Sequence, residues 1–465
     1  MSTNSTSDNR ANKTTLESVY LALTSEDDGR LCKDIPESAC NDQPKHFLSH
    51  VISLTSSKSA DSLIDPKLIL AWLFTQLGAS AFIVGLLVPI REAGALLPQL
   101  FIANWVRQRS QRKWVWAIGS AIQGMCVIGM VVAIMSLDQE DAVYVLLGLV
   151  SVLALARSFC SVSYKDVLGK TVSKSTRGTA TGLATSLAAI TILTFAILIS
   201  FSIVTLSIDI ILILLTIAGL LWLFAAINFL SLTEHSGATE GGASAIHGLA
   251  QRVRRAFQDN QFSLFIATRA CLVTSTLAPP FILLLQQQLN TKQQLITSNT
   301  ALEEISSSLN LGSDLGLLIL ASALASLFSS YIWGRLADRS SRKVLIFAAC
   351  TSALMYAVIT IGLLTEASFL TEPFAVPLIL FVIMVAYQGV NLGRSTHLVD
   401  MAPEEKRADY TAVSNTVIGL VLTLGSLFGW LAQSYGLVVL FSIFFLLASL
   451  AAIIATRLSE VQQTE

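Results

Sequence analysis

Charged side chains are scarce in this chain of 465 residues, at 13% of the sequence. A soluble domain averages about 25% charged residues, and a soluble protein of this length needs polar side chains to cover two or three domains. Hydrophobic residues make up 53%, and the mean hydropathy is +0.66. This composition argues against a soluble enzyme and predicts an integral membrane protein embedded in a lipid bilayer.

Several chemical signatures are also missing. The chain has no nucleophile motif, phosphate-binding loop or Rossmann fingerprint, so we expect no enzymatic activity, no cofactor and no nucleic-acid partner. The seven residues between Cys32 and Cys40 do not fit the usual zinc-ligand spacing, so we expect no metal site. The first 45 residues are polar and carry no secretory signal, which predicts a loosely folded tail.

What the chain does contain is a series of apolar runs. A helix needs about 20 apolar residues to cross a bilayer. Eleven segments meet this requirement: 80–104, 114–135, 142–163, 179–203, 207–231, 262–285, 311–333, 343–364, 374–395, 411–434 and 436–456.

An internal repeat predicts a twelfth span. The segment from Asn104 to Lys113 resembles the one from Gly334 to Lys343, and the loop ending at Arg177 resembles the loop ending at Arg407. Both pairs are separated by 230 positions. The span at 262–285 must therefore have a partner between about 46 and 78, although that segment is polar and Pro66 is expected to break or kink it. The fold class is thus all-α, with twelve transmembrane helices in two pseudo-symmetric bundles of six.

The distribution of basic residues predicts the topology. Alternate loops carry 18 Lys and Arg residues, whereas the intervening loops carry Lys292 alone. Because cytoplasmic loops are the basic ones, both termini are expected in the cytoplasm of a multi-pass protein of the bacterial inner (plasma) membrane. The expected divisions are a tail (1–45), a first bundle (46–232), a linker (233–260), a second bundle (261–457) and a C-terminal tail (458–465).

The segment Gly334-Arg-Leu-Ala-Asp338-Arg339-Ser-Ser-Arg342-Lys343 resembles the major facilitator superfamily. The family pattern there is Gly-x-x-x-Asp-Arg/Lys-x-Gly-Arg-Arg/Lys, and Ser341 stands where the family often has Gly. The loop from Asp400 to Arg407 also resembles the family, and the likeness covers about residues 46–457. It implies alternating access between two bundles.

The resemblance also implies a gating role for the motif residues Gly334, Asp338, Arg339 and Arg342. In the family, the motif Asp faces a helix N-terminus across the cytoplasmic interface, where the helix dipole favours an anion. The first copy of the motif has Gln108 at that position, so only Asp338 can play this part. The alternative is that the basic residues merely set the topology.

Charged residues at membrane depth provide the candidate solute site. A charge at the bilayer centre costs about 2.5–3.5 kcal/mol on insertion scales, so such residues normally face a cavity. By the resemblance, spans one, four, seven and ten line that cavity. A guanidinium binds carboxylate or phosphate through two parallel hydrogen bonds, which favours an anionic solute. The candidate substrate contacts are Arg157, Arg269, Lys58, Arg91, Gln388 and Asn391.

Glu92 and Asp61 are the candidate proton carriers, because a solute that competes for a neighbouring arginine could couple its binding to protonation. The alternative is a fixed structural ion pair between these acids and Arg91 or Arg157. Arg394, near the cytoplasmic end of span ten, is expected to snorkel to the interface.

The sequence therefore predicts a monomeric secondary transporter that moves a small, anionic solute by alternating access, with protons as the candidate coupling ion. Two alternatives remain open. One is export of amphipathic compounds, and the other is a non-transporting membrane assembly or sensor protein that kept the fold.

Overall fold

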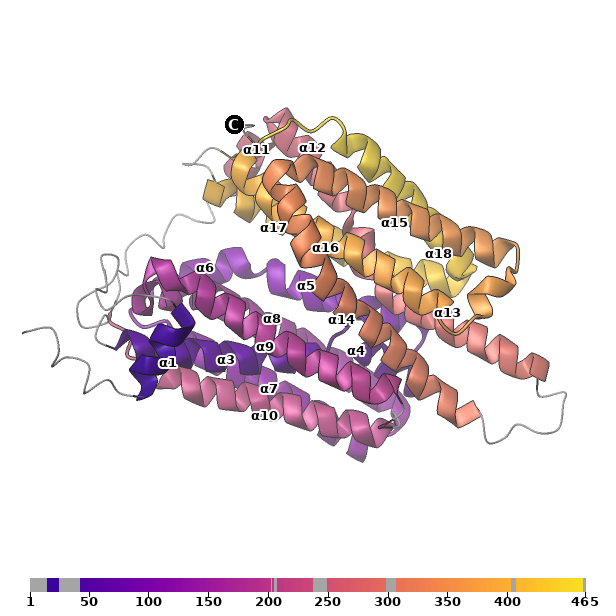
Figure 1. Cartoon of the computed structure of the whole chain (residues 1–465), viewed down its shortest axis with the longest axis horizontal. Coiled ribbons are helices and arrows are strands. Elements are labelled where there is room, and N and C mark those ends of the chain that lie inside the picture. Colours follow the sequence, from indigo (N-terminus) through magenta and orange to yellow (C-terminus); the bar gives the residue numbers. More distant parts are fainter. Residues whose placement is uncertain are drawn as a thin grey trace, which may run out of the picture.

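The computed structural model of the chain describes residues 15–24, 42–201, 203–204, 207–236, 249–297, 307–402 and 407–462. These residues form helices and turns without any strand. Two helical bundles lie side by side, and both described ends of the chain lie on the left in Figure 1. We call this side, which carries α1 (Thr15–Thr24), α11 (Leu249–Phe257) and residue 462, the tail end, and the opposite side the far end.

The first bundle contains six spans, two of which are interrupted. The first span breaks between α3 and α4, and the second breaks between α5 and α6 at Leu97 and Pro98. The helices are α3 (Gln43–Leu63), α4 (Ile69–Gln76), α5 (Ala81–Leu96), α6 (Gln99–Arg107), α7 (Lys113–Ser136), α8 (Gln139–Thr171), α9 (Lys174–Ser200) and α10 (Ile208–Leu230).

The second bundle repeats this arrangement. Its first span is interrupted at Leu272, between α12 and α13. The helices are α12 (Asn260–Cys271), α13 (Val273–Thr297), α14 (Ser307–Arg339), α15 (Ser341–Leu364), the short 3-10 helix η2 (Ser368–Thr371), α16 (Ala375–Met401), α17 (Arg407–Leu424) and α18 (Leu427–Ala455).

The helices are consistent with twelve spans. By length and composition, nine helices in the described part of the chain could cross a membrane, or ten if the bent pair within α14 is one span. One of the nine, Asp409–Ala455, has 47 residues, which is about 70 Å of helix and twice the thickness of a bilayer core. It turns at Gly436, whose φ of +82° suits glycine, and so it supplies spans eleven and twelve. The polar first span, α3 with α4, completes the twelve.

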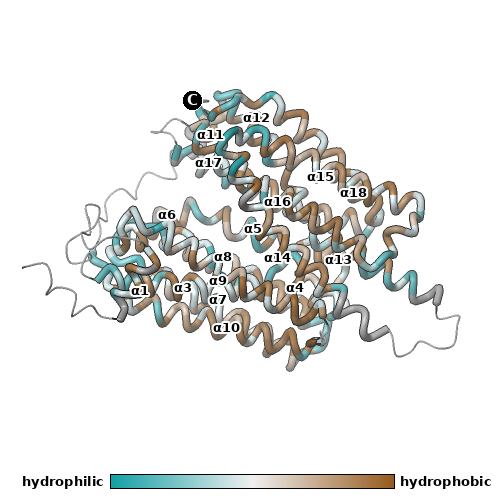
Figure 2. Tube along the Cα trace, viewed as in Figure 1, coloured by the Kyte–Doolittle hydropathy of each residue, from teal (hydrophilic) through white to brown (hydrophobic). Residues whose placement is uncertain are grey.

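Polar partners explain how α3 can be a spanning helix despite its low hydropathy. Asn228 on α10 donates to the carbonyl of Ser49 (3.0 Å) and to the hydroxyl of Ser53 (2.7 Å). The His50 ring pairs with the Thr171 hydroxyl at 2.8 Å. Because buried polar groups are costly unless hydrogen-bonded, α3 is stable only inside the bundle. Figure 2 shows the contrast between this helix and the apolar α10 beside it.

The two bundles approach most closely toward the far end. α14 of the second bundle lies along α9 of the first (Figure 1). A Cβ atom on Gly85 of α5 would lie 2.6 Å from the Cα of Gly429 on α18. Side-chain hydrogen bonds also join the bundles there, from Gln287 to Thr75 at 2.9 Å. The far end is therefore closed in this conformation.

Candidate functional site

A cavity of about 490 Å³ lies between the two bundles. Six spans line it: the first (α3 and the break after it), second (α5), fourth (α8), fifth (α9), eighth (α14) and tenth (α16). The lining contains four basic and three acidic side chains: Lys58, Lys67, Arg91, Arg157, Asp61, Asp65 and Glu92. Gln388 and Asn391 also line it, so seven of the eight predicted solute and proton residues meet here and one, Arg269, does not.

Asp61 joins two arginines from different helices at this cavity. Its Oδ1 accepts a hydrogen bond from Nη2 of Arg91 on α5, and its Oδ2 accepts one from Nη1 of Arg157 on α8. The Arg91 side chain is 4% exposed, whereas that of Arg157 is 43% exposed. Arg91 is therefore held in the protein interior by the pair, while Arg157 presents part of its guanidinium to the cavity. Both arginines thus form the ion pair with Asp61 that was considered as the alternative to solute contact.

The break in the first span adds cavity-lining residues that were not among the predicted site residues. α3 ends at Leu63 and α4 begins at Ile69, which confirms the interruption expected at Pro66 and places Asp65 and Lys67 at the cavity. Lys67 is buried, and its Nζ donates to the Tyr387 hydroxyl of α16 at 2.9 Å, 4.0 Å from the centre of that ring. The sequence contained a signal for these two residues, because Asp65 and Lys67 flank the helix-breaking Pro66 inside a predicted span.

The other cavity residues differ in how firmly they are held. Lys58 donates to the Thr185 hydroxyl on α9. Gln388 donates to the Ser326 hydroxyl of α14 at 2.7 Å. No described residue forms a salt bridge with Glu92, although it lies in the electrostatic field of Lys67 and Arg157. Glu92 thus differs from Asp61, whose two carboxylate oxygens each accept a hydrogen bond from an arginine.

Arg269 lies apart from the cavity lining. It is buried in the second bundle, where its Nη1 donates to the Ser414 hydroxyl of α17 and its guanidinium lies 5.8 Å from the Phe265 ring. Span seven does not line the cavity in this conformation. The middle of α13 is instead packed into the apolar core through Leu277, Ala278 and Phe281.

The repeated motif loops lie at the tail end in equivalent positions. In the first bundle, Arg112 pairs with Asp166, and the backbone N–H of Lys113 donates to Glu234 Oε2 at 2.7 Å. In the second bundle, Arg342 donates to the Leu458 carbonyl at 3.0 Å, and the Ser340 hydroxyl donates to Glu460 Oε2 at 2.7 Å. In each bundle, an acidic residue that follows the last helix (Glu234 or Glu460) thus holds the start of the third span in place.

The predicted gating residues lie on this second loop. Gly334 lies in the last turns of α14, and Asp338 and Arg339 end the same helix with exposed side chains. No described residue forms a hydrogen bond or ion pair with Asp338, so the predicted contact with a helix N-terminus is not formed in this conformation. Residues 403–406 of the adjoining loop, most of the tail 1–45, residues 237–248 of the linker and residues 463–465 lie outside the described residues.

Comparison with known proteins agrees with this architecture. The sequence profile of the Major Facilitator Superfamily matches residues 293–464. No curated protein gives a significant sequence match to the chain. Among solved structures, a D-xylose-proton symporter is similar at a TM-score of 0.63 and 10% identity, over 90% of this chain and 98% of that one.

Two further structures extend the likeness. The nucleoside transporter NupG has a TM-score of 0.61 at 13% identity, over 89% of this chain and 98% of that one. The inward open conformation of the xylose transporter XylE from E. coli has a TM-score of 0.57 at 10% identity, over 90% of this chain and 97% of that one. The family match thus covers the C-terminal part of the chain, and the likeness to these solved structures shows the two-bundle fold over nearly the whole chain.

Proposed function

We propose that this protein is a secondary active transporter that moves a small, anionic solute across the bacterial inner membrane by alternating access. The observation that carries the proposal is Arg157: a partly exposed guanidinium at a cavity between two bundles that are closed together at the far end. Transport is the function that such a cavity serves, because a solute bound there is exposed to one side of the membrane at a time.

The proposed orientation places the tail end in the cytoplasm. The basic loops at 106–114 and 334–343 lie at that end, and cytoplasmic loops carry an excess of Lys and Arg. With this orientation, closure at the far end corresponds to a protein that faces inward. The reciprocal conformation would separate Gly85 from Gly429 and bring the tail ends of the bundles together.

The charge of the cavity favours an anion. Its four basic and three acidic side chains leave one positive charge in excess when all are ionised. A carboxylate or phosphate would bind Arg157 in competition with Asp61, and Lys58, Gln388 and Asn391 would supply further hydrogen bonds. Arg91 belongs to the solute site only indirectly, since its side chain is 4% exposed and faces Asp61.

Arg269 remains a proposed solute contact on separate grounds. Its Nη2 is buried without a hydrogen-bond partner among the described residues, and no described acid forms an ion pair with it. A buried cation that no carboxylate compensates is costly. An anion that passes between the cavity and the tail end would relieve that cost.

Proton coupling would follow from the same competition. A solute that draws Arg157 away removes a positive charge from Asp61 and thereby favours proton uptake by Asp61 or Glu92. Replacement of Glu92 by glutamine should make transport insensitive to the proton gradient while solute exchange continues. Transport by the unaltered protein that ignores pH and uncouplers would remove the coupling from the proposal.

Ligand-dependent thermal stability tests the solute class. The purified protein in detergent is heated with mono- and dicarboxylates, inorganic phosphate and sugar phosphates, with neutral sugars and lipophilic cations as comparison. A ligand at about 100 times its Kd should stabilise the protein by about 2.7 kcal/mol. Stabilisation by anions that disappears in Arg157→Ala and persists in Arg255→Gln, on the exposed face of α11, is the expected result. Stabilisation by lipophilic cations alone would favour export of amphipathic compounds instead.

A further inference from the structure

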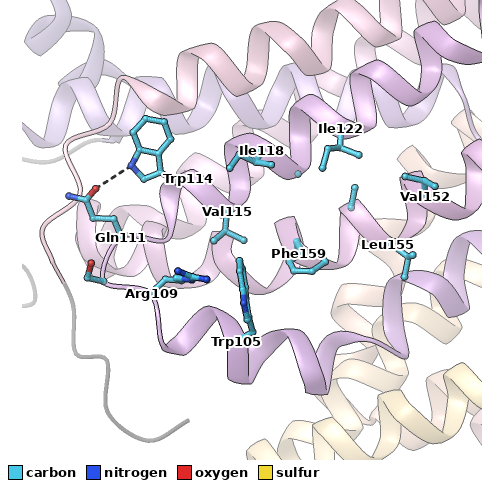
Figure 3. Close-up of a pocket in the computed structure, with 13 residues that line it drawn as sticks. Trp105, Arg109, Gln111, Trp114, Val115, Ile118, Ile122, Val152, Leu155 and Phe159 are labelled. Carbon is cyan, nitrogen blue, oxygen red and sulfur yellow. Dashed lines mark hydrogen bonds between the residues drawn. The ribbon is translucent and has the colours of Figure 1, made fainter. Parts of the chain in front are cut away.

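A second hollow, of about 630 Å³, lies on the outside of the first bundle. It is bounded by α6, the loop after it, α7 and α8, and it shares no lining residue with the central cavity (Figure 3). Its walls are aliphatic, with Ile118 and Ile122 on α7 facing Val152 and Leu155 on α8. We call this hollow the outer groove.

The outer groove opens toward lipid. Ile118 is 57% exposed, Leu155 46% and Val152 45%. All three lie within helices that span the membrane, where exposed apolar side chains contact the hydrocarbon of the bilayer. The groove therefore offers a recessed apolar surface to an acyl chain.

The end of the outer groove nearest the tail end is polar and positively charged. The Arg109 guanidinium lies 4.5 Å from the centre of the Trp105 ring, which packs edge-on against Phe159 at 5.8 Å between centroids. Across the groove, Trp114 Nε1 donates to Gln111 Oε1 at 3.3 Å (Figure 3). Tryptophans at such a position mark the membrane–water boundary.

The charge of Arg109 is uncompensated within the described part of the chain. Its neighbour Arg112 pairs with Asp166, whereas no described acid lies within ion-pair distance of Arg109. Stacking on Trp105 orients the guanidinium without neutralising it, because the ring carries no net charge. An exposed cation directly above an apolar groove matches the chemistry of an anionic lipid.

We propose that the outer groove is a binding site for an anionic phospholipid from the leaflet at the tail end. The lipid phosphate binds Arg109 between Trp105 and Trp114, and one acyl chain lies along Ile118, Val152 and Leu155. This site is independent of the solute cavity, since it lies on the opposite side of α8 from the bundle interface.

Native mass spectrometry of the full chain tests the proposal. The detergent-purified protein is incubated with phosphatidylglycerol or phosphatidylcholine of identical acyl chains, and the retained lipid is counted. One arginine near a lipid surface is expected to favour the anionic lipid about fivefold. Arg109→Gln should abolish that preference, while Arg255→Gln removes the same charge from α11 and should leave it intact.

A second variant tests the apolar part of the outer groove. Val152→Trp adds bulk at an exposed position and should reduce retention of both lipids, with an unchanged melting temperature in lipid-free detergent. Equal retention of the two lipids by the unaltered protein would overturn the proposal. A preference that survives in Arg109→Gln, or retention that Val152→Trp leaves unchanged, would overturn it as well.

Discussion

Asp61 Oδ2 accepts a hydrogen bond from Nη1 of Arg157, and this pair joins the first span to the fourth at the edge of the central cavity. The other oxygen of Asp61 holds Arg91, so a single carboxylate compensates two guanidiniums. The two arginines differ in exposure, at 4% for Arg91 and 43% for Arg157. One therefore anchors the structure, and the other is available to a solute.

Loss of the Asp61 charge should destabilise the protein. Asp61→Asn leaves Arg91 buried without an acid, which costs about 3–5 kcal/mol for a fully buried pair. Because Asp61 is 25% exposed, solvent screening reduces this to about 1–3 kcal/mol. Thermal unfolding in detergent measures the effect, and Glu92→Gln, at a carboxylate without a salt bridge, is the matched control. Equal melting temperatures for the two variants would contradict the assigned role of Asp61.

Closure at the far end should depend on Gly85. Alanine at this position would place its Cβ atom 2.6 Å from the Cα of Gly429, which forces the bundles apart there. We expect Gly85→Ala to favour the conformation that is open at the far end. Gly148→Ala is the control, because a Cβ atom there meets nothing within 4 Å.

Cysteine labelling reads out this change. A cysteine in place of Ser322, which lines the cavity, is introduced into cysteine-free protein and exposed to an impermeant maleimide from the far side. Faster labelling in Gly85→Ala than in Gly148→Ala is the expected result. Identical labelling rates would mean that the close glycine contact does not control far-end closure.

The bond between Lys67 and Tyr387 should stabilise the same conformation. Tyr387→Phe removes the 2.9 Å hydrogen bond and keeps the ring 4.0 Å from the ammonium group, whereas Tyr387→Ala removes both contacts. The labelling rate from the far side should therefore be lowest in the unaltered protein, higher in Tyr387→Phe and highest in Tyr387→Ala. A hydrogen bond from a charged donor contributes about 1.5–3 kcal/mol, so even Tyr387→Phe should give a several-fold change. A rate that is the same in all three proteins would contradict a role of the Lys67–Tyr387 contact in far-end closure.

Asp338 should act on the transport rate and leave solute affinity unchanged. Its side chain is exposed and unpaired among the described residues here, and we expect it to meet a helix N-terminus when the tail end closes. That contact is worth about 0.3–1 kcal/mol, so Asp338→Asn should slow transport a few-fold. Gln108→Asn, in the first copy of the motif, is the control. Weaker binding in Asp338→Asn at an unchanged rate would assign Asp338 to the solute site instead.

The all-helical, two-bundle fold could be predicted because hydropathy, the repeat and the loop charges agree. The polar first span was recovered only through the repeat, since its stability depends on partners such as Asn228 and Thr171 that are distant in sequence. The break at Pro66 followed from the chemistry of proline. The break at Leu97 and Pro98 was missed although Pro98 carries the same signal as Pro66. The break at Leu272 was missed because leucine carries no local signal for it.

The lining of the central cavity was predicted in part. Charges at membrane depth correctly indicated that Lys58, Asp61, Glu92 and Arg157 meet at one cavity. The sequence could not reveal that Asp61 spans two arginines, nor that Arg269 packs against Ser414, because both depend on helix rotation within the bundle. Lys67 was overlooked although two charges flank Pro66 within a predicted span, whereas its contact with Tyr387 of the other bundle could not be read from the sequence.

Solute counterflow in proteoliposomes tests the central proposal most directly. Vesicles loaded with an anion that stabilises the protein are diluted into a trace of the same labelled anion, and accumulation is followed over time. The proposal predicts that the unaltered protein accumulates label and that Arg157→Ala lowers this at least about tenfold, which corresponds to about 1.4 kcal/mol of lost binding. Anions that bind tightly and never cross, in vesicles with correctly folded protein, would contradict transport and favour a non-transporting role.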